Sequence, residues 1–147
     1  MRCRNAVQLF AVVAVTASCV APARTLADYE AKAADTAAAV VSASRTVVLT
    51  ARLAAAGRSF GATVAVTVAD AEVDAASARD AFASIQPPDD ASDAIRRRVL
   101  PAVERAVRVI ELVRIAARRD ELDGLPAIAR PLEPIASSLE RFSTRYG

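Results

Sequence analysis

Three carboxylates in the middle of the chain have a spacing that could support chemistry. Asp70 and Asp74 lie four residues apart with Glu72 between them, which would place a carboxylate pair on one side of a helix. Such a pair could hold a metal ion or act in acid–base catalysis. The apolar residues of the same segment fall on the opposite side, so a solvated acidic face explains the pair better.

A second acidic stretch, Asp89, Asp90 and Asp93, precedes a long apolar-periodic segment. It lacks the alternating spacing and the closing glutamate of an EF-hand calcium loop. We expect these residues to start a helix, with Ser92 or Asp93 accepting hydrogen bonds from its first amides.

Arg96, Arg97 and Arg98 follow at once and are candidate contacts to an anionic partner. Three cations in the first turns of a helix oppose its dipole, although the aspartates before them can offset the charge in water. The partner could be a lipid headgroup, a polyanionic envelope polymer or an acidic protein surface. Successive helical residues point about 100° apart, so one flat partner cannot engage all three equally.

The sequence lacks the residues that several common catalytic and metal-binding sites require. The chain has no histidine, and its two cysteines are Cys3 and Cys19, so Ser–His, Cys–His and thiolate-metal sites cannot form beyond residue 19. Two of the 19 basic residues, Arg2 and Arg4, lie in the N-terminal segment, so residues 24–147 carry 17 basic and 17 acidic residues. We therefore expect no enzyme, no cofactor, no metal and no nucleic-acid partner.

The N-terminus has the three parts of an export signal. Arg2 and Arg4 precede an apolar run over 6–17, and Ala21-Pro22-Ala23 offers a small-residue cleavage site. The run is short for a membrane span, which needs about 20 apolar residues. The sequence thus predicts a signal over 1–23 and a folded domain over 24–147.

The segment Ala17-Ser18-Cys19 resembles the end of bacterial lipoprotein signals, although Thr16 stands where that family usually has leucine. The resemblance implies that Cys19 becomes the first mature residue and carries lipid, which would hold the protein on the extracytoplasmic face of the membrane. The alternatives are cleavage after Ala23 or Ala27, which would give a secreted protein, and an uncleaved N-terminal anchor.

Four later segments share a seven-residue apolar pattern, which predicts amphipathic helices and no strands. The four stripes are Ala33, Ala37, Val40, Ser44, Val47, Ala51 and Ala54; Val64, Val68, Ala71, Ala75, Ala78, Phe82 and Ile85; Ile95, Val99, Ala102, Ala106, Val109, Val113 and Ala116; and Leu125, Ile128, Leu132, Ile135, Leu139, Phe142 and Tyr146. Stripes of this kind bury one another, so the predicted fold is an all-α, antiparallel up-down four-helix bundle with a core rich in alanine and valine.

Prolines and loops refine this prediction. Pro101 lies inside the third stripe without shifting its phase, which indicates one kinked helix. The prolines of the fourth segment predict a turn over 120–129 and then a helix from Pro131. We expect Gly57 to end the first helix and Phe60 to cover the end of the bundle.

The charges of the middle segments are opposite. The second carries Asp70, Glu72, Asp74 and Asp80 against Arg79, whereas the third has eight arginines between 96 and 119 against two glutamates. We expect their flanks to pair as antiparallel neighbours.

Functionally, we expect a non-enzymatic, exported helical domain that binds a protein or envelope component. The alternative is a structural module at the membrane surface, held by lipid or by an uncleaved anchor. An exposed apolar groove between helices would favour the first function.

Overall fold

The structure, a computed structural model, describes residues 22–147, and these are all-α. Its five α-helices are α1 (Leu26–Ala55), α2 (Gly61–Ser84), α3 (Asp90–Arg118), α4 (Leu125–Ala129) and α5 (Leu132–Tyr146), with a 3-10 turn η1 (Leu122–Gly124) before α4. The predicted signal segment and both cysteines lie outside the described residues, except for Pro22 and Ala23.

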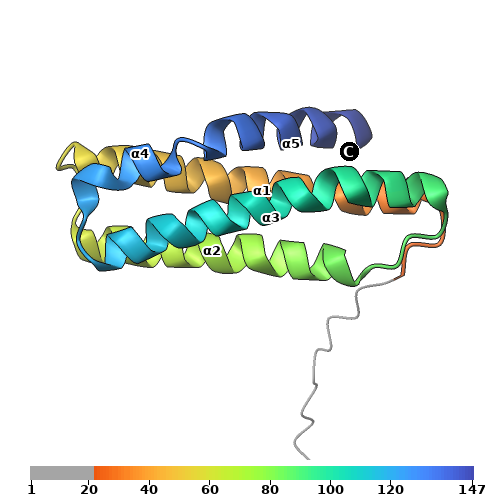
Figure 1. Ribbon diagram of the computed structural model, residues 1–147, viewed down its shortest axis with the longest axis horizontal. Coiled ribbons are helices and arrows are strands. Elements are labelled where there is room, and N and C mark those ends of the chain that lie inside the picture. Colours follow the sequence, from red (N-terminus) through yellow and green to blue (C-terminus); the bar gives the residue numbers. More distant parts are fainter. Residues whose placement is uncertain (1–21) are drawn as a thin grey trace, which may run out of the picture.

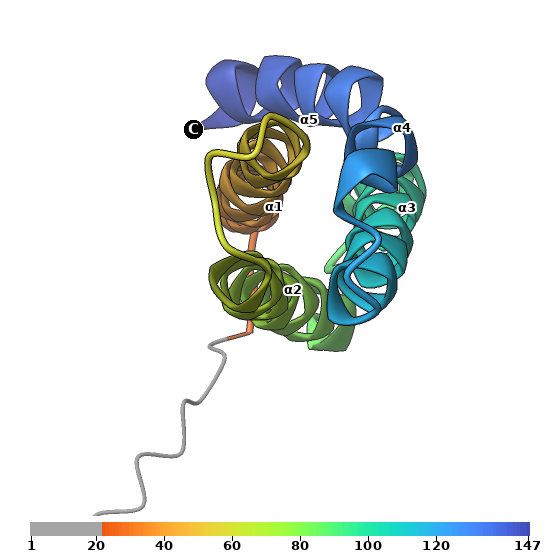
Figure 2. The same ribbon diagram turned by 90° about the vertical axis from the view of Figure 1, so that its left-hand side faces the viewer.

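The three long helices run antiparallel to their chain neighbours along the long axis of the molecule (Figure 1). α1 packs against all the other helices, whereas α5 packs against α1 and α3 on the side away from α2 (Figure 2). The predicted fourth helix is therefore divided. The turn and the helix that begins near Pro131 agree with the prediction, whereas the short helix α4 was not predicted.

The buried face of α1 is built from small residues. All seven residues of its predicted stripe are buried, together with Tyr29, Ala34 and Val41. Alanine and serine let neighbouring helices approach closely, and the high helix propensity of alanine helps to keep a 30-residue helix intact. The second stripe also lies in the core, except that Ala78 is only half-buried.

α1 is also the one helix among residues 22–147 that is long and apolar enough to cross a membrane, with a mean hydropathy of 1.3. In the fold, 44% of an apolar 18-residue stretch of α1 is buried inside the structure. An apolar helix near the N-terminus is compatible with export or membrane attachment, and a buried core helix has the same composition.

α3 starts earlier than predicted. Its N-cap is Asp89, whose carboxylate accepts a hydrogen bond of 2.8 Å from the Ser92 backbone N–H, so the expected cap at Ser92 or Asp93 is wrong. That hydrogen bond holds the pKa of Asp89 below its usual value. Ser92 is instead buried in the first turn of the helix.

The buried face of α3 includes five of the seven residues of the predicted stripe and extends beyond them on one side. Ile110 and Val103 are fully buried, whereas Val109 and Ile95 are only partly buried. α3 packs against α1 and α2 on one side and against α4 and α5 on another, so its buried arc is wider than one stripe. Pro101 lies on the exposed face of a continuous helix.

The loop between α1 and α2 reverses the chain at Gly57, whose φ of 65° suits the left-handed position after a helix. Phe60 is 85% exposed, so it does not cover the end of the helices as expected. Gly61 begins α2 close to the side chain of Asp120, and a Cβ at Gly61 would collide with the Asp120 Oδ1. Glycine at this position therefore lets the start of α2 lie close to the turn after α3.

The wider buried face of α3 can be tested with two neighbouring substitutions. Ile110→Asp should unfold the domain, because an unpaired carboxylate buried in the core costs more than about 4 kcal/mol. Val109→Asp should cost less, since that carboxylate can reach water. Circular dichroism during thermal unfolding measures both, and equal losses of stability would contradict the observed phase of α3.

Candidate functional site

A groove of about 270 Å³ runs between α1 and α5. Its floor contains Ser44, Leu132 and Ala136, which are buried, together with the partly buried Val48. Leu49 stands at its edge and is 58% exposed. The groove is therefore mainly apolar inside and open to solvent.

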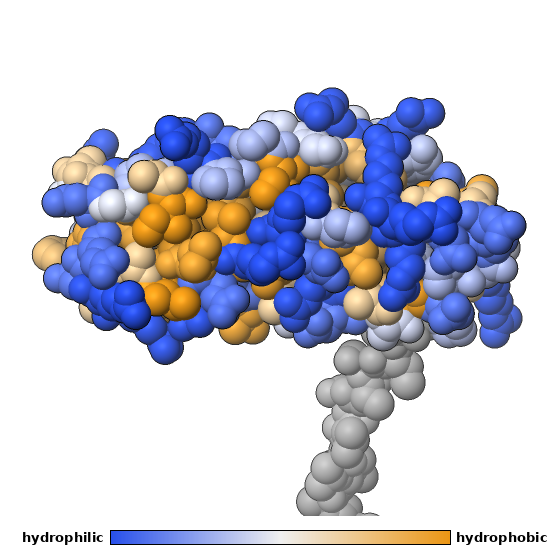
Figure 3. Space-filling view, viewed as in Figure 1, coloured by the Kyte–Doolittle hydropathy of each residue, from blue (hydrophilic) through white to orange (hydrophobic). Residues whose placement is uncertain are grey.

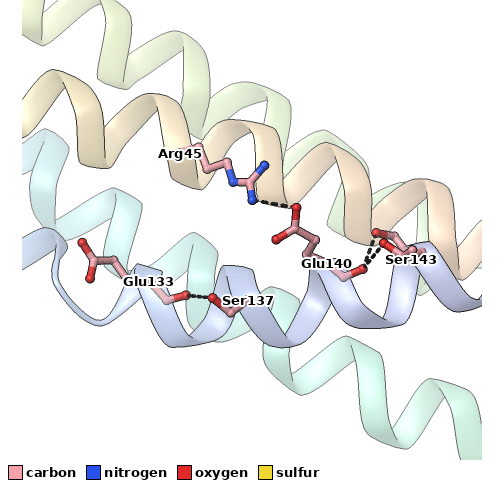
Figure 4. A network of polar contacts seen from close by, with 6 residues as sticks. Arg45, Glu133, Ser137, Glu140 and Ser143 are labelled. Carbon is pink, nitrogen blue, oxygen red and sulfur yellow. Dashed lines mark hydrogen bonds and ion pairs between the residues drawn. The ribbon is translucent and has the colours of Figure 1, made fainter.

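Two ion pairs join α1 to α5 along this groove. Arg45 donates to Glu140 at 2.6 Å, as Figure 4 shows, and Arg52 pairs with Glu133 about two turns away along each helix. All four side chains are largely exposed, so each pair adds little stability. Their effect is to place opposite charges at the edges of an apolar groove and to fix the position of α5.

The groove continues beyond the Arg45–Glu140 pair. A second hollow of about 500 Å³ extends towards the C-terminal half of α5, and Leu49 lines both hollows. Ser44 adds a buried hydroxyl that has no hydrogen-bond partner among the described residues. A ligand that entered the groove would thus meet apolar surface, one buried hydroxyl and paired charges at the rim.

Asp70 and Asp74 line a different groove, of about 540 Å³, between α1 and α2. Both are exposed, as expected for a solvated acidic face. Glu72 turns away from them and pairs with Arg114 of α3, which confirms the predicted pairing between the flanks of the two segments. Within residues 22–147, no group of three acidic, histidine or cysteine side chains could hold a metal ion.

The structure separates the arginine triplet. Arg96 donates hydrogen bonds to the backbone oxygens of Ile85 at 2.8 Å and Ala83 at 2.7 Å, at the C-terminal end of α2. The guanidinium of Arg98 lies over the Phe142 ring of α5, 5.9 Å from its centre. Arg97 is exposed and makes no ion pair or hydrogen bond within the part of the chain that the structure describes.

Arg96 also approaches a buried tyrosine that the sequence analysis missed. The Tyr29 ring packs on Phe82 with ring centres 5.4 Å apart, and its hydroxyl makes no hydrogen bond among residues 22–147. Burial raises the pKa of the Tyr29 phenol, and the nearby guanidinium of Arg96 opposes part of that rise. Tyr29 lies four residues before Ala33, so extending the first stripe by one turn would have found it.

No protein-family model, curated protein or solved structure matches the chain. The function must therefore be argued from the grooves and charges of the described residues.

The separated arginines should respond differently to substitution. Arg96→Gln should destabilise the domain by about 1.5–3 kcal/mol, because two hydrogen bonds from a charged group to α2 are lost. Arg97→Gln should stay within roughly 0.5 kcal/mol of the parent, as for most surface changes. Chemical denaturation of both variants provides the measurement, and equal stability would argue against a structural role for Arg96.

Proposed function

We propose that this chain is a non-enzymatic, exported domain that lipid on Cys19 holds at the membrane and that binds a protein partner in the α1–α5 groove. In this proposal α1, α2, α3 and the α4–α5 pair take the four positions of a helical bundle. The alternative is a structural module at the membrane surface without a partner, and the exposed arginines of α3 favour it.

The start of the fold supports lipid attachment over the other cleavage positions. Ala23 is 7% exposed and belongs to the hydrophobic core, and Thr25 caps α1 by accepting a hydrogen bond of 3.1 Å from the Asp28 N–H. Cleavage after Ala27 would remove this cap, and cleavage after Ala23 would remove the core residue. A mature chain that begins at Cys19 keeps both.

A lipid on Cys19 would also restrict the distance between the fold and the bilayer. Two residues separate Cys19 from Pro22 in the sequence. Three residue steps of extended chain span at most about 11 Å. The end of the molecule where α1 begins would therefore stay close to the headgroups.

The groove between α1 and α5 is the observation that favours a protein partner. A buried apolar floor and an exposed Leu49 suit an apolar side chain from another molecule, and the Arg–Glu pairs at the rim can exchange partners with a peptide. An amphipathic helix fits this chemistry, because it would present an apolar stripe with polar residues on both sides.

Replacing Cys19 by Ala tests the attachment. The variant should move from the membrane to the soluble fraction, or remain as an uncleaved precursor, since no thiol is left to accept lipid. Cell fractionation with intact mass measurement distinguishes these states from the parent. A mature mass and location that do not change would support cleavage after Ala23 and would contradict lipid attachment.

A photocrosslinking amino acid at position 49 tests the groove. It should give a discrete crosslinked product in cells, whereas the same amino acid in place of Val66, which is equally exposed on α2, should not. Adding Arg45→Glu should weaken the product at position 49, because the rim would then carry two like charges. Equal products at both positions, or none at position 49, would rule out the groove as a docking site.

A further inference from the structure

The outer face of α3 carries a row of four exposed arginines, Arg97, Arg98, Arg105 and Arg108, here called the arginine row. At about 100° per residue, their side chains fall within an arc of roughly 100° on the helix. The fully buried Val103 and Ile110 lie on the opposite side. The four arginines therefore lie on one face of α3. The arginine row shares Arg97 and Arg98 with the triplet but does not include Arg96.

The positive charge of the row is not neutralised within the described residues. Arg45, Arg52, Arg79 and Arg114 each pair with a carboxylate, whereas no member of the row makes an ion pair. Asp93 lies four residues before Arg97, and Glu104 and Glu111 lie within four residues of Arg108, yet none of these carboxylates forms an ion pair with the row. The row therefore presents guanidinium groups that have no carboxylate partner among the described residues.

The same face also exposes apolar surface. Leu112 is 56% exposed and lies within the arc, four residues after Arg108 and seven after Arg105. In Figure 3, where α3 faces the viewer as in Figure 1, hydrophilic side chains cross this face beside an apolar area. A soluble polyanion would have no contact for an exposed leucine, whereas a bilayer interface accommodates arginine and leucine together.

We infer that the arginine row and Leu112 form a contact surface for an anionic phospholipid membrane, with α3 lying along the bilayer. The guanidinium groups would bind lipid phosphates, and Leu112 would enter the headgroup region. From Arg97 to Leu112 the face is about 22 Å long, which allows contact with several headgroups at once. The inference deepens the proposed attachment through Cys19, since the lipid would hold the molecule near the bilayer.

Vesicle flotation of the full chain, made by cell-free translation and so without lipid on Cys19, provides the test. The vesicles are neutral phosphatidylcholine, or the same lipid with a third replaced by phosphatidylglycerol. The apolar run over 6–17 and its arginines are common to all variants, so only differences between variants matter. Arg105→Glu and Arg108→Glu should each lower binding to the anionic vesicles about fivefold or more at low salt.

The matched control is Arg58→Glu, which makes the same charge change at an exposed arginine of the α1–α2 loop that has no ion pair among residues 22–147. It should bind like the parent. Leu112→Ser should weaken binding with little change in salt dependence, because its contribution is apolar. Circular dichroism should show that all four variants are folded.

Equal losses for Arg58→Glu and the row variants would overturn the inference, because binding would then follow net charge alone. No loss in any row variant would overturn it too and would leave an acidic protein as the partner to examine. Because the translated chain carries no lipid, a row-specific loss supports this surface even if the Cys19→Ala experiment contradicts the proposed attachment.

Discussion

Every other helix packs against α1, and the small side chains on its buried face decide how closely they do so. Alanine and serine at positions such as Ala37, Ser44 and Ala51 allow short distances between helix backbones. The same small side chains leave space wherever a neighbour does not fill it. α5 has 15 residues against 30 in α1, so it covers only part of that surface, and the groove beside Ser44 and Leu49 lies between the two.

How far the sequence predicts the fold depends on how many neighbours a helix has on each side. The stripes of α1 and α2 could be predicted because each helix shows one dominant apolar line, and residues such as Val40 and Val68 are buried accordingly. α3 has parallel apolar lines through Val109 and through Ile110, and periodicity alone does not rank them. The packing of α3 against four other helices selects Ile110. The start of α3 was ambiguous because Asp89, Ser92 and Asp93, which lie within five residues of one another, could each cap the helix.

The candidate site was less accessible from sequence. Helical spacing shows that the triplet must diverge, but not that Arg96 reaches the end of α2, since that depends on how the loop over 85–89 folds back. The Arg45–Glu140 pair joins residues 95 positions apart, and no local pattern relates them. By contrast, the arc containing Arg105, Arg108 and Leu112 follows from the phase of α3 once its buried side is known. The positions of residues around a single helix could thus be predicted from the sequence, whereas contacts between helices could not.

The position of α5 at the end of the chain affects how the protein can be made. α1 leaves the ribosome first, and the residues that cover its far side, such as Leu132 and Leu139, are synthesised some 80 to 100 positions later. Until then the side of α1 that α5 covers has no protein against it, on a helix that is apolar enough to enter a bilayer. Such contacts between distant parts of a chain form late, and an incomplete chain exposes surface prone to aggregation. Complete burial of α1 therefore requires α5, and a factor that shields the nascent chain would act on the side of α1 that α5 covers.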